Sequence, residues 1–437
     1  MKKKMVSIMT ILGIVMGSVA MGGQAVPVKA AGVEITEANF GTDQNVIQCI
    51  KRADADKDGI LSDGEAAQIT SLYFADVTND ISNTVKHFPK LTSVSVKVGQ
   101  NDSLTINQTS IKEVTVHAQK VINIKGSNSF TKVWYYLEET KGKVDFSKAQ
   151  GYEKVTSFSV YGAGITGVVA PNQKNLTQLS VLGTKMSKMD AAKYNKLTTL
   201  NLSSNQLKSI DVKKNKSLVS LACYDNKLTS LNIASNKKLK DIGVGGNKLT
   251  KLDTKKNTKM LRIMAADNKL KNYNPASNKK LTELNVSGNK LTKLDVSKNK
   301  NLKILYISNN KIKNMNFNKN KKLLTLSVAD TKLKKLTLPK SVKLGYINVG
   351  SSYNFLKNVK FQSKYVGISL ALPKNKTYQM TKLIPALKGY KFVSYNDKLV
   401  IDESGKFKMP SLDKEYIVSL PATKGKSSAS IGLSVKS

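Results

Sequence analysis

Apolar residues recur through most of the chain with a spacing of 21 residues. The most regular series is Leu176, Leu197, Leu218, Leu239, Met260, Leu281, Leu302, Leu323 and Leu344. If each of these is position 1 of a unit, further apolar residues stand at positions 4, 6, 11, 14 and 16. The alternation of apolar positions 4 and 6 with positions 3, 5 and 7 predicts a short strand whose odd-numbered side chains face solvent. A fixed period of this length is typical of a solenoid, in which strands of successive turns form a parallel sheet.

The same phase continues towards the N-terminus, with less regular spacing. It passes through Val155, Trp134, Ile111, Leu91 and Ile69. The segment from position 69 to position 344 then corresponds to about thirteen turns. Because the second half of each unit has no helical pattern, we expect the outer side to be extended too. The predicted fold class is a β-rich repeat solenoid over residues 69–361.

Two asparagine columns accompany the apolar ones. Position 9 holds Asn205, Asn226, Asn247, Asn268, Asn289 and Asn310, and position 19 holds Asn215, Asn236, Asn257, Asn278, Asn299 and Asn320. We expect these side chains to be buried and to bond backbone groups at each turn, which would form a ladder along the axis. The apolar and asparagine columns are therefore interpreted as scaffold and not as a site.

The unit is close to L-x-x-L-x-L-x-x-N-x-L and resembles the leucine-rich repeat family. It is most similar to the internalin-type surface and secreted proteins of Gram-positive bacteria, in which a calcium loop also precedes the repeats. This resemblance implies an extracellular binding or adhesion protein whose rigid solenoid presents a surface to a protein or glycan ligand. Members of the family bind different targets, so the resemblance does not name the ligand.

One calcium-binding loop is complete in the sequence. Residues 54–65 match D-x-[DN]-x-[DN]-G-x5-E without a gap, as in EF-hand and dockerin loops. The spacing assigns Ca²⁺ ligands to Asp54, Asp56, Asp58, the Ile60 carbonyl, Ser62 through a water, and Glu65 in bidentate fashion. The alternative is a solvated acidic turn. No second loop is present in the sequence, so the site is interpreted as structural and not as a sensor.

The residues flanking this loop predict a small helical cap over residues 31–68. Thr42 can cap an entering helix that runs through Val46, Ile47 and Ile50. Glu65 would begin a short exit helix through Ile69. We expect this EF-hand-like module to cover the first turn of the solenoid, because the open end of a solenoid needs a cap.

The N-terminus has the pattern of an export signal. Three lysines precede an apolar run from Met5 to about Ala20, and small residues then lead to Ala30. This order of regions predicts a secretory signal peptide at residues 1–30. The apolar run is too short for a membrane span. We expect the mature chain to be secreted or held non-covalently at the cell surface, without a membrane span or a covalent anchor.

The repeat period is lost after about Phe361. Short alternating runs follow, for example from Val366 to Leu372 and from Ala429 to Val435, with turn residues between them. This pattern predicts a small antiparallel sandwich over residues 362–437, and it resembles the immunoglobulin-like modules that follow such repeats.

The charge is strongly basic, with 71 Lys and Arg against 30 Asp and Glu, a net charge of +41. Only Arg52 and Arg262 are arginines, so sequence-specific nucleic-acid binding is not expected. Position 10 forms a lysine ladder of Lys227, Lys248, Lys269, Lys290, Lys311 and Lys332. The ladder has two interpretations: a solvated face set by codon composition, or attachment to a wall polyanion such as teichoic acid.

Outward strand positions are the usual binding surface of a curved solenoid, and most of them here are small. The larger exceptions are Tyr161, Tyr224, Arg262, Met264 and Tyr306. Tyrosine and arginine are frequent interface anchors, although single exposed aromatic residues also occur on ordinary surfaces.

The sequence contains only two histidines and two cysteines, which argues against histidine-based catalysis and against zinc sites built from several Cys or His ligands. The sequence holds no nucleophile elbow, zinc-protease helix or phosphate-binding glycine loop. We therefore expect a monomeric binding protein and not an enzyme. The second interpretation is a structural envelope protein held on wall polyanions by its lysines.

Overall fold

The computed structural model describes most of the repeat region and its two flanking modules. The described residues are 32–77, 79–127, 129–338, 344–350, 365–373, 376–384, 387–388, 391–392, 399, 401–402, 405–409, 417–424 and 427–436. The predicted signal peptide at residues 1–30 lies outside them.

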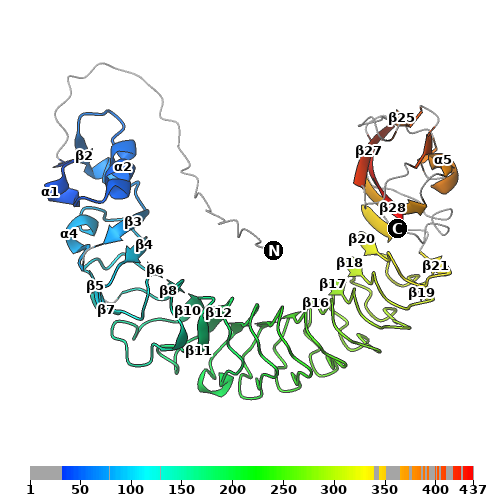
Figure 1. Ribbon diagram of the computed structural model, residues 1–437, viewed down its shortest axis with the longest axis horizontal. Coiled ribbons are helices and arrows are strands. Elements are labelled where there is room, and N and C mark those ends of the chain that lie inside the picture. The colour runs from blue at the N-terminus through cyan, green and yellow to red at the C-terminus, as the bar shows by residue number, and fades with distance from the viewer. Residues whose placement is uncertain are drawn as a thin grey trace.

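The repeats form a curved solenoid, and the main parallel sheet lines the inner, concave side of its arc (Figure 1). Neighbouring strands pair in step, so that Thr199 of one turn lies opposite Ser220 of the next. The strands are β3 (Ser71–Val77), β4 (Ser93–Val98), β6 (Glu113–His117), β8 (Lys132–Tyr136), β10 (Ser157–Tyr161), β12 (Gln178–Leu182), β13 (Thr199–Asn201), β14 (Ser220–Ala222), β15 (Asp241–Gly243), β16 (Arg262–Met264), β17 (Glu283–Asn285), β18 (Ile304–Tyr306), β20 (Thr325–Ser327) and β22 (Tyr346–Gly350). The predicted solenoid of about thirteen turns is confirmed.

The apolar columns form one continuous core inside the arc. In one unit Leu281, Leu284, Val286 and Leu291 are all completely buried. Burial of each such side chain contributes about 1.5–3 kcal/mol relative to an exposed one. Because every turn repeats these positions, each turn covers the apolar face of its neighbour.

The predicted phase was wrong at Trp134. Lys132 of β8 pairs with Ser157 of β10, so the residue in step with Val155 is Phe130, which is 2% exposed. Trp134 instead stands at a solvent-facing strand position and is 40% exposed. The turns on either side of Phe130 differ in length from 21 residues, and two aromatic residues four apart compete for the apolar column.

The turn after each concave strand from β12 to β20 takes one residue into the left-handed region, at position 8. Asp225 has φ 51°, Asp267 has φ 52° and Asn309 has φ 54°, while Gly246 and Gly288 hold the same position in other turns. Asp, Asn and Gly are the residue types that adopt this conformation most readily. The bend directs the asparagine at position 9 into the core.

The asparagines at position 9 bond both their own turn and the preceding one. The Nδ2 of Asn247 donates to the carbonyls of Cys223 (2.8 Å), Val244 (3.1 Å) and Gly245 (3.1 Å). Its Oδ1 accepts from the backbone N–H of Leu228 at 2.9 Å. The predicted asparagine ladder is confirmed.

The asparagines at position 19 form a second ladder with different bonding. The Nδ2 of Asn257 donates to the carbonyls of Ile233 and Asn236, both at 2.9 Å. Its Oδ1 is buried and has no hydrogen-bond partner among the described residues. The side chain therefore uses its donors and leaves its acceptor unpaired.

The convex side is built from turns and short extended segments in the described residues after 193, as predicted. Before residue 193, the convex side also contains two short parallel strand pairs. β5 (Ser103–Ile106) pairs with β7 (Asn123–Gly126), and β9 (Gly142–Asp145) pairs with β11 (Ile165–Val169). A 3-10 turn, η1, covers Ala191–Lys193, and β19 (Asn314–Asn316) pairs with β21 (Lys335–Thr337) further on.

Helices gather at the N-terminal end of the arc, beside β3 (Figure 1). They are α1 (Glu37–Phe40), α2 (Gln44–Ala53), α3 (Asp63–Ala66) and α4 (Ser82–Val85). The N-cap of α2 is Asp43 and not the predicted Thr42, because its Oδ1 accepts from the N–H groups of Asn45 (2.9 Å) and Val46 (3.3 Å). The other oxygen of Asp43 accepts from Ala75 N–H in β3 at 2.6 Å, which joins the helix to the first solenoid strand.

The C-terminal strands extend the main sheet instead of forming the predicted wholly antiparallel sandwich. β23 (Tyr365–Pro373) pairs in parallel with β22 and with β28 (Ser427–Lys436). β27 (Ile417–Lys424) is antiparallel to β28 and to β25 (Lys391–Phe392). A separate small sheet joins β24 (Thr377–Gln379) to β26 (Lys406–Lys408), next to α5 (Met380–Leu383). Strand periodicity located β23 and β28 but not β24 or β26, and it does not encode which neighbour each strand pairs with.

Candidate functional site

The predicted calcium loop is positioned by α2 on one side and by a short strand on the other. α2 ends at Ala53, and β2 (Ile60–Ser62) pairs antiparallel with β1 (Gly32–Glu34). A Cβ at Gly32 would stand 2.5 Å from the Leu61 carbonyl oxygen, so only glycine allows this close approach. The loop thus pairs with a segment outside it, a strand that the sequence analysis missed.

Three of the predicted ligands converge. Asp54, Asp56 and Asp58 each offer a carboxylate oxygen, and these atoms lie within 4.8 Å of one another. Asp54 is buried, and its Oδ1 has no hydrogen-bond partner among the described residues. A buried carboxylate oxygen without a donor is costly unless a cation compensates it. The residues present therefore fit a hard cation such as Ca²⁺, which prefers oxygen ligands.

Glu65 connects the two ends of the loop. Its Oε1 accepts from Ala55 N–H at 2.6 Å, and its Oε2 accepts from the N–H (3.0 Å) and hydroxyl (2.8 Å) of Ser62. Burial raises the pKa of Glu65, but these hydrogen bonds outweigh burial and the pKa is lowered overall. The carboxylate is therefore ionised at neutral pH.

The exit helix is shorter and earlier than predicted. α3 starts at Asp63 and not at Glu65, because Ser62 and Glu65 form a capping box at its N-terminus. Ser62, predicted to hold a water, acts here as the N-cap, and Ile60 donates its N–H to Asp58 Oδ1 at 2.7 Å.

The five side chains predicted to face a ligand all lie on or beside strands of the concave sheet. Tyr161 ends β10, Arg262 and Met264 belong to β16, Tyr306 ends β18, and Tyr224 follows β14. They do not form one cluster: Tyr161 lies several turns from the others. The concave side is thus confirmed as their location, and their role in binding stays a prediction.

Tyr224 and Arg262 belong to one polar group on this face. The ring of Tyr224 lies against the next turn, where a Cβ at Gly243 would stand 2.3 Å from the ring. Arg262 Nε forms an ion pair with Asp241 at 2.5 Å. Burial and the nearby carboxylate of Glu283 raise the pKa of Tyr224, so its hydroxyl stays protonated.

A row of rings crosses the N-terminal half of the concave sheet, and the sequence analysis missed it. His117, Tyr136 and Tyr161 occupy position 7 of three successive strands, β6, β8 and β10. The His117 and Tyr136 rings stack, with centroids 4.7 Å apart and planes at 7°, and the Tyr136 and Tyr161 centroids are 6.1 Å apart. Aligning the turns on Phe130 instead of Trp134 would have shown this row.

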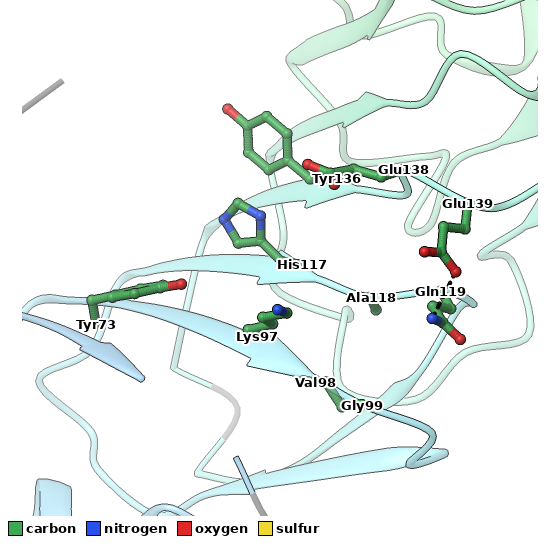
Figure 2. Close-up of a pocket in the computed structure, with 10 residues that line it drawn as sticks. All are labelled: Tyr73, Lys97, Val98, Gly99, His117, Ala118, Gln119, Tyr136, Glu138 and Glu139. Atoms are coloured by element: carbon green, nitrogen blue, oxygen red, sulfur yellow. Dashed lines mark hydrogen bonds between the residues drawn. The ribbon is translucent and has the colours of Figure 1, made fainter. Parts of the chain in front are cut away.

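A hollow of about 390 Å³ lies beside this row (Figure 2). Tyr73 faces it from β3, Lys97 from β4, and Glu138 and Glu139 from the segment that follows β8. Desolvation lowers the pKa of His117, and the Lys97 charge lowers it further against the opposing effect of Glu138. The imidazole is therefore neutral near pH 7.

The six ladder lysines are all exposed. Their backbones stay in step: Lys248 N–H donates to the Leu228 carbonyl, and Lys269 N–H to the Leu249 carbonyl, both at 2.9 Å. Strand spacing places successive rungs about 4.8 Å apart. In the part of the chain that the structure describes, none of the six forms an ion pair with a carboxylate.

The two cysteines are free. Cys223 is completely buried at position 6 of its turn, as predicted, and burial raises the pKa of its thiol to about 12. Cys49 is half-buried in α2. Within the described residues no helix has the length and apolar content needed to cross a membrane.

A model of the Leucine Rich repeat family matches residues 195–214, 224–245 and 277–298. The fold is a leucine-rich repeat solenoid. The matched segments lie in the most regular turns, where both asparagine ladders are complete. A search of curated proteins finds no sequence that matches the chain.

Solved structures with a similar trace include several bacterial repeat proteins. The functional domain of InlJ from Listeria monocytogenes, described as including a cysteine ladder, is 20% identical and has a TM-score of 0.49, over 93% of this chain and 99% of that one. The Leptospira interrogans protein LIC12759 is 17% identical with a TM-score of 0.47, over 70% of this chain and 91% of that one. The internalin InlF of L. monocytogenes is 14% identical with a TM-score of 0.45, over 72% of this chain and 93% of that one.

Proposed function

We propose that this chain is an extracellular binding protein that presents the concave sheet of its solenoid to a ligand. The observation that carries this proposal is the row of rings formed by His117, Tyr136 and Tyr161 on that sheet. All three side chains are partly exposed, and aromatic side chains are enriched at binding surfaces. The protein acts through its rigid shape and is not an enzyme in this proposal.

Export is part of the proposal and rests on the n-region, apolar run and small residues of residues 1–30. Ca²⁺ is the proposed cofactor of the cap. It would be held by Asp54, Asp56 and Asp58, whose oxygens converge, with Glu65 fixed beside them. Extracellular calcium is plentiful, so an affinity of about 10⁻⁴–10⁻³ M would keep the site occupied. The bound ion would neutralise the carboxylates and hold the cap against β3.

Fractionation of the cells that naturally make the chain tests this proposal. We expect the protein in the medium or on the cell surface, with a mature N-terminus at Ala31 by N-terminal sequencing. Protease added to intact cells should digest the surface fraction. An unprocessed chain confined to the cytoplasm would contradict the proposed extracellular role.

A second candidate function is attachment to a wall polyanion such as teichoic acid. The observation that favours it is the lysine ladder, whose exposed members stand in register and lack carboxylate partners. Regularly spaced cations along a rigid edge match the repeating phosphates of a linear polyanion. Such binding weakens steeply with salt, because it releases condensed counterions.

A matched pair of triple variants separates the ladder from net charge. K248Q/K290Q/K311Q removes three ladder lysines, and K256Q/K298Q/K319Q removes three exposed position-18 lysines from the same three turns. We expect the first variant to leave immobilised teichoic acid at clearly lower salt than the second. Equal elution of the two variants would show that total charge, and not the ladder, controls adsorption.

A further inference from the structure

The hollow on the first strands of the concave sheet lies apart from both the calcium loop and the lysine ladder. Its walls come from β3, β4, β6 and β8 and from the segments that follow β4, β6 and β8. In Figure 2 the side chains of Tyr73, His117 and Tyr136 stand on the same side of the sheet around it. The hollow is thus formed by strands that the solenoid holds in fixed register.

Two large apolar side chains flank this region and remain exposed. Tyr73 is 44% exposed, and Trp134, on the strand that carries Tyr136, is 40% exposed. Both stand at position 5 of their strands, and the intervening position-5 residues, Ser95 and Thr115, are small. The result is a shallow polar floor between two aromatic side chains, with the His117–Tyr136 stack along one side.

Polar groups at the other side of the hollow are held in place before any ligand arrives. Gln100 Nε2 donates to Gln119 Oε1 at 2.7 Å, and Gln119 Nε2 donates to Glu139 Oε2 at 2.8 Å. This chain of bonds fixes a planar amide and a carboxylate across the hollow from the rings (Figure 2). Pre-organised acceptors of this kind bind hydroxyl groups with little loss of side-chain entropy.

The charge of the hollow narrows the ligand class. Its lining has one cation, Lys97, against Glu138 and Glu139, in a chain with a net charge of +41. A polyanion would meet the two carboxylates here and is better matched by the lysine ladder. A strongly cationic ligand would be repelled by the field of the whole chain. An uncharged ligand with both apolar faces and hydroxyl groups meets neither obstacle.

We infer that this hollow binds a neutral oligosaccharide. The carbon–hydrogen faces of sugar rings pack on the exposed rings of Tyr73 and Trp134, with Tyr136 as part of the wall beside them, while sugar hydroxyls donate to the Glu139 carboxylate. His117, neutral at pH 7, offers a ring face without adding charge. This inference rests on the proposed binding function and gives it a ligand class.

Trp134 provides a direct measurement, because it is the only tryptophan in the chain. The full-length mature protein is titrated with cellohexaose, chitohexaose and mannohexaose while its intrinsic fluorescence is recorded. A heparin hexasaccharide and an oligolysine peptide serve as anionic and cationic probes. We expect a saturable fluorescence change with at least one neutral hexasaccharide, unchanged by added salt because no ion pairs form.

Variants locate the binding. Tyr136→Ala removes part of the wall, and Trp134→Ala removes an exposed ring that the fold does not need. Tyr346→Ala is the control, because it makes a Tyr-to-Ala change at an exposed residue of β22, on the same concave sheet but far from the hollow. By calorimetry, Tyr136→Ala and Trp134→Ala should weaken the neutral sugar about tenfold, and Tyr346→Ala should leave it unchanged.

Three results would overturn the inference: no neutral sugar binds, only the charged probes bind, or the Tyr346 variant is affected as much as the Tyr136 variant. These results leave the proposed function open to its own test. A chain that is exported and found on the cell surface but binds no neutral sugar would still be an extracellular binder of another ligand. A chain retained in the cytoplasm would end the proposed function, whatever sugar it binds.

Discussion

The imidazole of His117 lies flat against the phenol ring of Tyr136, with ring centroids 4.7 Å apart and planes at 7°. Parallel pairing of β6 and β8 places the two residues directly opposite each other. Stacking half-buries the imidazole, and this desolvation lowers its pKa. The packing of these two rings therefore links the stability of the fold to pH.

This link predicts a loss of stability in mild acid. The pKa of His117 and that of His87 are both lowered from about 6.5, in each case first by burial. The unfolded chain then binds more protons than the folded one once the pH falls below about 6.5, so the free energy of unfolding decreases through the lowered pKa values. Urea denaturation at about pH 7.5 and about pH 5.5 measures this decrease.

Histidine variants test whether the two imidazoles cause this loss of stability in acid. His117→Gln should lose less stability between the two pH values than the unaltered chain, and H87Q/H117Q should lose the least. The chain has two histidines, and the carboxyl group of Glu65, with its lowered pKa, titrates at still lower pH. An equal loss in all three proteins would show that other groups control the acid response.

Calcium should stabilise the cap through the loop carboxylates. At a hundred times its dissociation constant, a ligand of the folded state adds about 2.7 kcal/mol to the free energy of unfolding. We expect Ca²⁺ to raise the melting temperature and EDTA to lower it, as measured by scanning calorimetry. D56N/D58N should abolish the response. Asp63→Asn is the control, because Asp63 lies in the same loop but outside the carboxylate cluster. A calcium response that survives in D56N/D58N would contradict the assignment.

The two asparagine ladders should differ in strength. Asn247→Ala removes hydrogen bonds to three carbonyls and also leaves the buried Leu228 N–H without its acceptor. We expect a cost of about 2–3 kcal/mol. Asn257→Ala removes two donor bonds and also an oxygen that has no partner, so about 1–2 kcal/mol should be lost. Urea denaturation of the two variants tests the order, and a larger loss for Asn257→Ala would reverse it.

Alanine substitutions at two glycines with left-handed backbone distinguish the energetic cost of backbone strain from that of steric crowding. Gly151 has φ 92°, and a Cβ there would stand 1.9 Å from the Ile124 carbonyl oxygen. Gly142 has φ 88°, and a Cβ there would meet no atom within 4 Å. Gly142→Ala should cost about 1–2 kcal/mol from backbone strain alone, and Gly151→Ala about 3 kcal/mol or more. Thermal unfolding gives both values. Equal costs would mean that the backbone at Ile124 moves aside freely.

The regular turns were predictable because each unit buries the same apolar positions in the same way. Leu281 and Leu284 are buried in their turn for the same reason as Leu302 and Leu305 in the next, so a column in the sequence is a column in the core. The convergence of the three aspartates in the loop was predictable because they are close in sequence. Both signals are local, and neither depends on how distant segments meet.

The first turns were harder because their lengths vary. When Trp134 was placed in the apolar column, the alignment of β8 shifted by four residues, and His117, Tyr136 and Tyr161 no longer fell in one column. Only strand pairing places Lys132 opposite Ser157 and so restores the row. The capping role of Asp43 was hidden for a similar reason, since one of its bonds reaches Ala75, 32 residues away.

The sequence by itself determined the solenoid, its two asparagine ladders, the oxygen-rich loop and the register of the lysines, because all of these follow from spacing along the chain. The tertiary structure decided which side chains share the concave hollow, how β1 completes the loop, and how β23 and β28 extend the sheet. These features depend on hydrogen-bond partners and burial between segments far apart in sequence. Periodicity records which face a residue occupies, but it does not record the neighbour that the residue meets there.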